Sequence, residues 1–164
     1  MAKTLVIIRH GKSTWDYSSV HDIDRPLKEI GISNTILTAQ RIKGNNVFPD
    51  IMVSSPANRA LHTALITARE LLFPVEKIII DSRFYCKSED EILQVIQATD
   101  NSFSCMFLFG HNPTFTRIPN YFLKQKVDNL PTSGAIIIEF TTSHWSDITN
   151  CHIKKEICYF PKNL

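Results

Sequence analysis

The strongest constraint on the fold is a repeated alternation of short apolar runs with segments of helical periodicity. Residues 4–8 (TLVII) form a β-branched, continuously apolar run, which is typical of a strand buried on both faces. Residues 28–43 have helical spacing and a stop signal at Gly44, and their apolar positions are Ile32, Ile36, Ala39 and Ile42. Strand and helix signals in this order indicate an α/β fold with a mostly parallel sheet.

The rest of the chain continues this alternation. Further strands are predicted at residues 51–53, 77–80, 105–109, 135–140 and 152–159. A second helix is predicted after Ser54-Ser55-Pro56, with apolar positions Leu61, Leu65, Ala68 and Leu72. A third follows the capping-box sequence Ser88-Glu89-Asp90-Glu91, and a fourth covers residues 115–123. No helix signal separates the last two strands, so we predict one domain, residues 1–164, with three α/β/α layers and an antiparallel sheet edge.

Size and charge limit the classes of function. The chain has 164 residues, enough for one core, and its net charge of +2 gives no sign of a nucleic-acid or membrane-surface protein. No apolar run approaches the roughly 20 residues that span a bilayer. The apolar stretch 5–8 ends at an arginine and lacks the features of a signal peptide, so we expect a cytoplasmic protein.

The cysteines give no metal-binding pattern. Cys86, Cys105, Cys151 and Cys158 contain no C-x-x-C pair. Cys151, His152 and Cys158 could be combined into a metal site, but alternation along a strand would place Cys151 and His152 on opposite faces. We therefore expect structural thiols, no metal and no cofactor.

Three segments that carry candidate catalytic or binding residues each follow a predicted strand. They are Arg9-His10-Gly11, the run from Ser54 to Arg59, and Gly110-His111-Asn112-Pro113. Because ligands of open α/β sheets bind at the carboxyl ends of the strands, these segments are predicted to meet there. Taken singly, Arg59 could be an exposed helix arginine and His111 a turn histidine, so their common placement carries the argument.

These residue types suit phosphoryl transfer. A neutral imidazole can attack phosphorus and form a covalent intermediate, which divides hydrolysis into two easier steps. Arginine forks on Arg9 and Arg59 match phosphate oxygens, and His111 could donate a hydrogen bond to one of them. Gly11 would let the backbone approach the phosphate closely.

Together these segments resemble the histidine phosphatase superfamily, which has the phosphoglycerate-mutase-like fold. Its R-H-G motif matches Arg9-His10-Gly11, its S-P-x-x-R-A-x-x-T-A motif begins at Ser55, and its later G-H motif matches Gly110-His111. The resemblance implies that His10 is the phosphorylated nucleophile and that Arg9 and Arg59 bind phosphate. It also implies that His111 completes the pocket.

Within the superfamily the chain looks most similar to the short SixA-like branch. That branch's D-R-P-L-x-x-x-G pattern matches Asp24-Arg25-Pro26-Leu27 and Gly31. Arg25 is then a further phosphate-binding residue. A turn ion pair between Asp24 and Arg25 explains the same residues equally well.

Two positions depart from the superfamily pattern. Many members carry a proton-donating glutamate after the third strand, whereas residues 83–89 (RFYCKSE) give no clear match. Glu89 and Glu91 are more simply explained as first-turn residues of a capped helix. Asp16 stands where several relatives have an asparagine that contacts phosphate. We expect it to pair with an arginine or to lie on the rim, and a role as general acid or base stays open.

The missing acid bears on the substrate. The imidazole of a phosphohistidine leaves more readily than an alkoxide, so a strong general acid is less necessary. Only residues 81–104 lie between the third and fourth strands, which leaves little chain for a lid over a small metabolite. We therefore predict a phosphohistidine phosphatase acting on a protein such as a histidine phosphotransfer domain. The alternatives are a phosphatase for a small phosphomonoester or sugar phosphate, and a phosphate-binding module without turnover.

Overall fold

A six-stranded mixed sheet forms the centre of the molecule in the computed structural model, which describes residues 1–85 and 88–161. The strand order is β3-β2-β4-β1-β5-β6. The strands are β1 (Thr4–Arg9), β2 (Ile51–Ser54), β3 (Ile79–Ile80), β4 (Cys105–Gly110), β5 (Ala135–Phe140) and β6 (Ile153–Tyr159). β3, β2, β4 and β1 pair in parallel, whereas β5 is antiparallel to both β1 and β6. The predicted antiparallel edge is confirmed.

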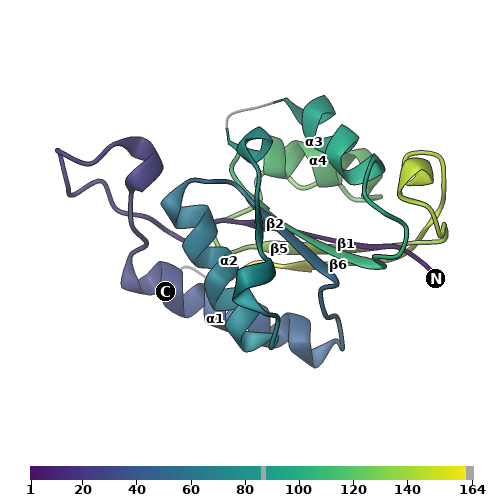
Figure 1. Cartoon of the computed structure of the whole chain (residues 1–164), viewed down its shortest axis with the longest axis horizontal. Helices are drawn as coiled ribbons and strands as arrows, with labels where there is room; N and C mark the ends of the chain where they lie inside the picture. The colour runs from purple at the N-terminus through teal and green to yellow at the C-terminus, as the bar shows by residue number, and fades with distance from the viewer. Residues whose placement is uncertain (86–87, 162–164) are drawn as a thin grey trace.

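Helices cover both faces of this sheet. α1 (Glu29–Gly44) and α2 (Asn58–Glu70) lie on one face, and α3 (Glu89–Gln97) and α4 (Thr114–Phe122) lie on the other (Figure 1). Short 3₁₀ helices occur at η1 (Asp22–Asp24), η2 (Val75–Lys77), η3 (Ser82–Phe84) and η4 (Trp145–Asp147). The three-layer prediction is confirmed, as is the capping box that begins α3 at Ser88.

The continuous apolar run of β1 is explained by its central position. Leu5 and Ile7 pack into the core beneath α3 and α4, and Val6 and Ile8 pack into the core beneath α1 and α2. A strand covered on both faces has no solvent side, so the four buried positions at residues 5–8 are all apolar. β1 therefore ends at the middle of the sheet's carboxyl edge.

The buried faces of α1 and α2 differ from those predicted. In α1 the buried positions include Thr35 and Thr38, whereas Ile32 and Ile36 are only half-buried. The reason is that Thr35 hydrogen-bonds to the Ser133 hydroxyl and Thr38 to the Ser133 carbonyl, across the gap to β5.

In α2 the helix turns its small residues inward. Ala60, Thr63 and Ala64 are fully buried, whereas Leu61 and Leu65 are half-buried. Leu72 lies beyond the helix end and is 83% exposed. Small side chains let α2 lie close to the strand ends.

Two further expectations need correction. The strand predicted at residues 77–80 is only Ile79–Ile80, an exposed edge strand, because Lys77 closes a 3₁₀ helix. Cys151 and His152 precede β6, so the expected strand alternation does not apply to them.

Three thiols can be described. Cys105 and Cys151 are free and half-buried, Cys158 is free and exposed, and Cys86 lies outside the described residues. In the described part of the chain no helix is long and apolar enough to cross a membrane.

Candidate functional site

The carboxyl ends of β1, β2 and β4 bring the three predicted segments together. Arg9 pairs with Gly110 in the register of β1 and β4, and Ser54 pairs with Phe109 in that of β2 and β4. A cavity of about 300 Å³ opens at this edge. It is lined by Arg9, His10, Lys12, Ser13, Trp15, Arg25, Arg59, His111, Asn112 and Thr132.

His10 follows β1 directly and is buried. Its Nδ1 lies 2.7 Å from the Gly11 carbonyl oxygen, so Nδ1 carries the proton and donates it there. In the neutral ring, Nε2 then holds the free lone pair. Burial, together with the charges of Arg59, Arg9 and Arg25, lowers the pKa of His10 to about 4. The imidazole is therefore neutral at physiological pH.

His111 follows β4 and faces His10, with 5.0 Å between the ring centroids. Its Nε2 lies 2.8 Å from Ser55 Oγ, and its Nδ1 is buried without a hydrogen-bond partner among the described residues. The ring of Tyr85 meets it edge-on at 5.5 Å. Burial, followed by the effect of His10 and Arg59, lowers the pKa of His111 to about 3. Both imidazoles at this site are thus uncharged.

Arg59 lies in the first turn of α2 and is buried. Its guanidinium donates to the Asp22 carbonyl oxygen at 2.6 Å and to the Asp22 carboxylate at 3.0 Å. One turn later, Thr63 accepts the backbone N–H of Gly11 at 2.9 Å. The inward face of α2 thereby holds both an arginine and the loop that carries His10.

Arg25 is held by three different acceptors. Its Nε donates to the Thr14 carbonyl at 2.9 Å, and its two Nη atoms donate to Ser13 Oγ and to Asp22 Oδ1. The expected turn ion pair therefore exists, but the partner is Asp22 and not Asp24. Arg25 nevertheless lines the cavity, so the structure is compatible with both explanations of this residue.

Asp22 is a site residue that sequence reasoning missed. Its carboxylate accepts from Arg25, Arg59 and the hydroxyl of Tyr85, which lies at 2.8 Å. Burial opposes ionisation of Asp22, but the hydrogen bonds from Tyr85, Arg25 and Arg59 outweigh it and lower the pKa to about 2. The one available signal was the three-residue spacing between Asp22 and Arg25 in a short helical turn.

Arg9 and Gly11 have structural partners of their own. Arg9 donates to the Leu130 carbonyl at 2.8 Å, and its Nε is buried without a partner in the described residues. A Cβ on Gly11 would lie 2.9 Å from the Gly31 carbonyl oxygen, which is closer than real Cβ contacts allow. A Cβ on Gly31 would lie 2.4 Å from the Lys12 carbonyl oxygen. Gly11 thus has a packing reason against α1, and its contact with a substrate stays a prediction.

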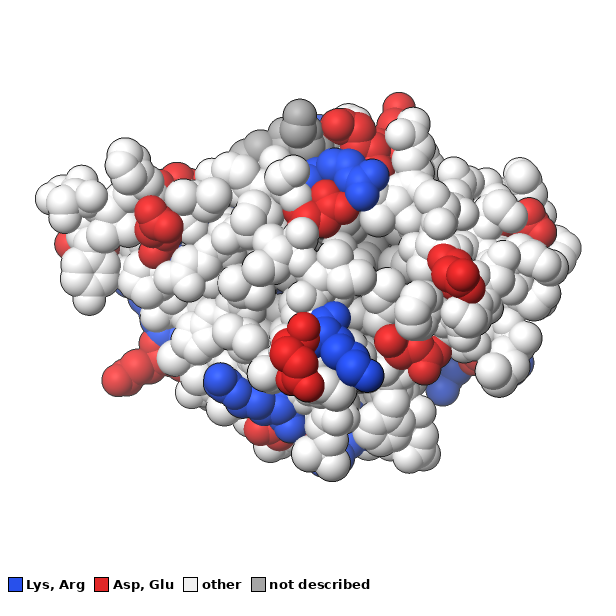
Figure 2. All heavy atoms as spheres, viewed as in Figure 1, with Lys and Arg blue, Asp and Glu red and all other residues white. Residues whose placement is uncertain are grey.

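Asp16 lies on the rim. Its side chain is largely exposed, accepts from the Thr14 hydroxyl and pairs with Lys28 at 3.7 Å. The partner is a lysine and not the expected arginine. Within residues 1–85 and 88–161, no carboxylate lines the cavity itself, whereas three arginines and a lysine do. The positive charge is local, since basic and acidic side chains are interspersed on the face shown in Figure 2.

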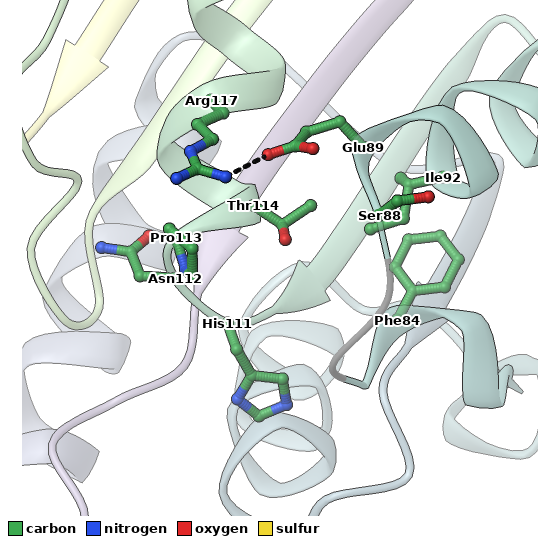
Figure 3. A pocket seen from close by; sticks show the side chains of 9 residues that line it. All are labelled: Phe84, Ser88, Glu89, Ile92, His111, Asn112, Pro113, Thr114 and Arg117. Atoms are coloured by element: carbon green, nitrogen blue, oxygen red, sulfur yellow. Dashed lines mark hydrogen bonds and ion pairs between the residues drawn. The ribbon is translucent and has the colours of Figure 1, made fainter.

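A second cavity of about 480 Å³ adjoins the first and shares His111 and Asn112 with it. Figure 3 shows His111 at one end of this cavity and the ion pair between Glu89 and Arg117, 3.1 Å long, at the other. A backbone hydrogen bond at the start of α3, together with Arg117, lowers the pKa of Glu89. Glu91 closes the capping box. Neither carboxylate is poised as a proton donor.

Comparisons with known proteins match the N-terminal half of the chain by sequence. The family profile of the histidine phosphatase superfamily (branch 1) matches residues 5–84. A 2,3-bisphosphoglycerate-dependent phosphoglycerate mutase of Bifidobacterium longum is 35% identical over 82 residues, 47% of this chain and 33% of the mutase. The chain thus spans about a third of the length of that relative.

Solved structures extend the likeness to the whole chain. The putative phosphohistidine phosphatase SixA from Nakamurella multipartitia superposes with a TM-score of 0.83 at 22% identity, covering 98% of this chain and 97% of that one. The protein histidine phosphatase SixA complexed with tungstate gives a TM-score of 0.77 at 22% identity, covering 94% and 96%. At these identities the comparison establishes a shared fold.

Proposed function

We propose that this chain, which belongs to the histidine phosphatase superfamily, is a cofactor-independent phosphatase that forms a covalent phosphohistidine on His10. One observation carries the proposal: a neutral imidazole, whose Nδ1 donates to the Gly11 carbonyl and whose Nε2 keeps the lone pair, lies in a cavity lined by basic groups and no described carboxylate. Such a cavity suits an anion, and such an imidazole suits attack on phosphorus.

The reaction has two displacements. His10 Nε2 attacks phosphorus, the bond to the leaving group breaks, and the phosphoryl group is left on His10. The ring gains positive charge in this step, and the hydrogen bond from Nδ1 to the Gly11 carbonyl stabilises that charge. Water then attacks the phosphohistidine, which releases inorganic phosphate and restores the neutral ring.

His111 acts as a hydrogen-bond donor in this mechanism. Ser55 Oγ accepts the backbone N–H of Ala57 at 3.2 Å, and in the proposed mechanism its own proton is donated to His111 Nε2, 2.8 Å away. The proton of the neutral His111 ring then resides on Nδ1. That N–H is buried and can donate to a phosphoryl oxygen, while Arg9, Arg25 and Arg59 stabilise the charge on the other oxygens.

The substrate is a phosphohistidine in a protein. Glu89 pairs with Arg117, Glu91 closes the capping box, and Asp90 lines neither cavity, so these carboxylates of α3 are not placed to protonate an alkoxide. A phosphoramidate is the substrate that least requires such an acid. The small phosphomonoester is the alternative, because the cavity of about 480 Å³ beside His111 could hold its leaving group. In that case Asp16 on the rim remains a candidate acid, although the Thr14 hydroxyl and Lys28 lower its pKa.

The test is a set of rapid-quench assays without added metal. The substrates are a phosphohistidine protein, a sugar phosphate and an aryl phosphate. We expect an acid-labile, base-stable phosphoenzyme and fastest turnover of the phosphohistidine protein. His10→Ala should abolish the phosphoenzyme and the turnover. His144 is an exposed histidine outside the cavity, so His144→Ala should change neither quantity.

The possible outcomes separate the alternatives. If His10→Ala kept most of the activity, the mechanism would be wrong. Turnover confined to small esters would support the small-molecule alternative. Phosphate binding that is lost in Arg59→Ala, with no turnover of any substrate, would indicate a binding module.

A further inference from the structure

The segment between β1 and α1 projects from the end of the sheet at the left of Figure 1. It carries two large exposed aromatic side chains, Trp15 at 73% and Tyr17 at 58% exposure. Aromatic residues of this size are normally withdrawn from water, and tryptophan and tyrosine dominate the binding energy of protein interfaces. Their exposure therefore needs an explanation.

Trp15 is held in place despite its exposure. The guanidinium carbon of Arg25 lies 3.3 Å from the centroid of the Trp15 ring. Arg25 is itself buried and bonded to Thr14, Ser13 and Asp22. One face of the indole thus rests on a rigid base, while most of the ring remains open to solvent. A side chain that is already ordered loses little conformational entropy when a partner covers it.

The position of Trp15 links it to the chemistry. Trp15 and Arg25 both line the cavity that contains His10. A polypeptide that delivers a phosphoryl group to His10 over this part of the cavity lining would contact Trp15. Tyr17 and the largely exposed Asp16 lie next along the chain, outside the cavity lining. The aromatic pair thus begins at the cavity lining with Trp15, and Tyr17 follows two residues later with a polar residue between them.

We propose that Trp15 and Tyr17 form a docking surface for the polypeptide that surrounds the phosphorylated residue of a protein substrate. This inference rests on the proposed function and names its partner more closely. A small phosphoramidate fills the cavity without reaching Tyr17, whereas a folded phosphoprotein covers both aromatic rings. The surface thus favours phosphoproteins over small phosphorylated molecules.

The kinetic test compares two substrates of the same bond type, a phosphohistidine protein and N-phosphoimidazole. In Tyr17→Ala the ratio of kcat/KM for the protein to kcat/KM for N-phosphoimidazole falls about tenfold, the effect of losing one interface anchor. Trp15→Ala lowers the ratio by at least as much. Tyr121→Ala is the matched control, because Tyr121 is 59% exposed on α4 and lies outside the cavity.

A binding test keeps the proposal independent of turnover. The chain has two tryptophans, and the other, Trp145, is fully buried. In His10→Ala, a tryptophan-free phosphohistidine protein should therefore shift the emission of Trp15, and Trp15→Phe should abolish the shift. Tyr17→Ala should weaken the affinity about tenfold.

Three results would overturn the docking surface. An unchanged ratio and affinity in both variants would do so, as would an equal loss in Tyr121→Ala. A wild-type dimer that Trp15→Ala dissociates would show that a second copy of the chain covers these rings. If wild type binds the phosphoprotein through Trp15 but hydrolyses neither substrate, the docking surface stands and the proposed phosphatase function fails.

Discussion

The two imidazoles that face each other across the cavity are held in opposite ways. His10 is fixed through Nδ1 by a backbone carbonyl, which leaves Nε2 free. His111 is fixed through Nε2 by the hydroxyl of Ser55, which leaves Nδ1 free. In the proposed mechanism the same residue type, neutral in both places, serves as a nucleophile at one position and as a donor at the other. The partner of each ring, more than its pKa, distinguishes the two roles.

The sharpest test of this contrast compares the two alanine variants. His10→Ala should lower kcat by about 10⁴-fold or more and abolish the phosphoenzyme, because the attacking atom is gone. His111→Ala should lower kcat by about 10²- to 10³-fold, as expected for one lost donor to the transition state, and still form the phosphoenzyme. Rapid quench measures both quantities. A phosphoenzyme in His10→Ala, or none in His111→Ala, would reverse the assignment.

Asp22 holds Arg25 and Arg59 in place, and its substitution should have the next largest effect on kcat/KM. In Asp22→Asn one amide oxygen must replace a carboxylate that accepts from Arg25, Arg59 and Tyr85. We expect kcat/KM to fall by about 10- to 100-fold because the guanidinium groups lose their orientation. Asp24→Asn changes a carboxylate of the same 3₁₀ helix and is the control. Tighter phosphate binding with faster turnover in Asp22→Asn would show that this carboxylate merely repels the substrate.

The lowered pKa values of the two rings predict a pH dependence of stability. Below about pH 6.5 the unfolded chain protonates both imidazoles, whereas the folded chain does so only near pH 4 and pH 3. The unfolded state then binds more protons, so the free energy of unfolding decreases as the pH falls. The loss between pH 7 and pH 5 is about 2 kcal/mol for each ring.

Urea unfolding of wild type and His10→Gln at both pH values measures this term. The difference between the proteins removes the contribution of groups that titrate in both. The free energy of unfolding of His10→Gln should decrease less between pH 7 and pH 5 than that of wild type, by the contribution of one imidazole. An identical dependence in the two proteins would mean that His10 is not held neutral by burial.

Ser55→Ala is the mildest change and tests how the His111 proton is placed. Loss of the hydroxyl should lower kcat about tenfold, the effect of one hydrogen bond. Nitrogen NMR shifts of His111 should show the proton redistributed between Nδ1 and Nε2. Ser54→Ala removes a neighbouring buried hydroxyl that bonds to the Ser55 carbonyl and should leave those shifts unchanged. Unchanged shifts in Ser55→Ala would remove Ser55 from the mechanism.

The sequence predicted those parts of the molecule that depend on local pattern. The run at β1, the capping box of α3 and the strand-end placement of His10, Arg59 and His111 all follow from short-range signals. Asp22 could not be found in this way. Its importance arises because η1 turns its carboxylate toward Arg59 and Tyr85, which come from distant parts of the chain.

The inward face of α2 was mispredicted for a related reason. Leu61 and Leu65 dominate the apolar pattern, but tight packing at the strand ends selects Ala60, Thr63 and Ala64 instead. Hydrophobic periodicity indicates which helix face is apolar, but it gives no information on the volume available where that face packs. The side chain of Arg59 also shares this inward face, which no apolar pattern could indicate.

The close packing of Gly11 against Gly31 makes the proposed active site sensitive to a position outside the cavity lining. A methyl group on Gly31 would press on the backbone of Lys12, two residues beyond the proposed nucleophile His10. The loop would have to move away from α1, and in the proposed mechanism this would displace the lone pair of His10 from the line of attack on phosphorus. Protein engineers who stabilise helices by replacing glycine with alanine should therefore leave this one untouched. The proposed orientation of His10 thus depends on the absence of a side chain at both Gly11 and Gly31.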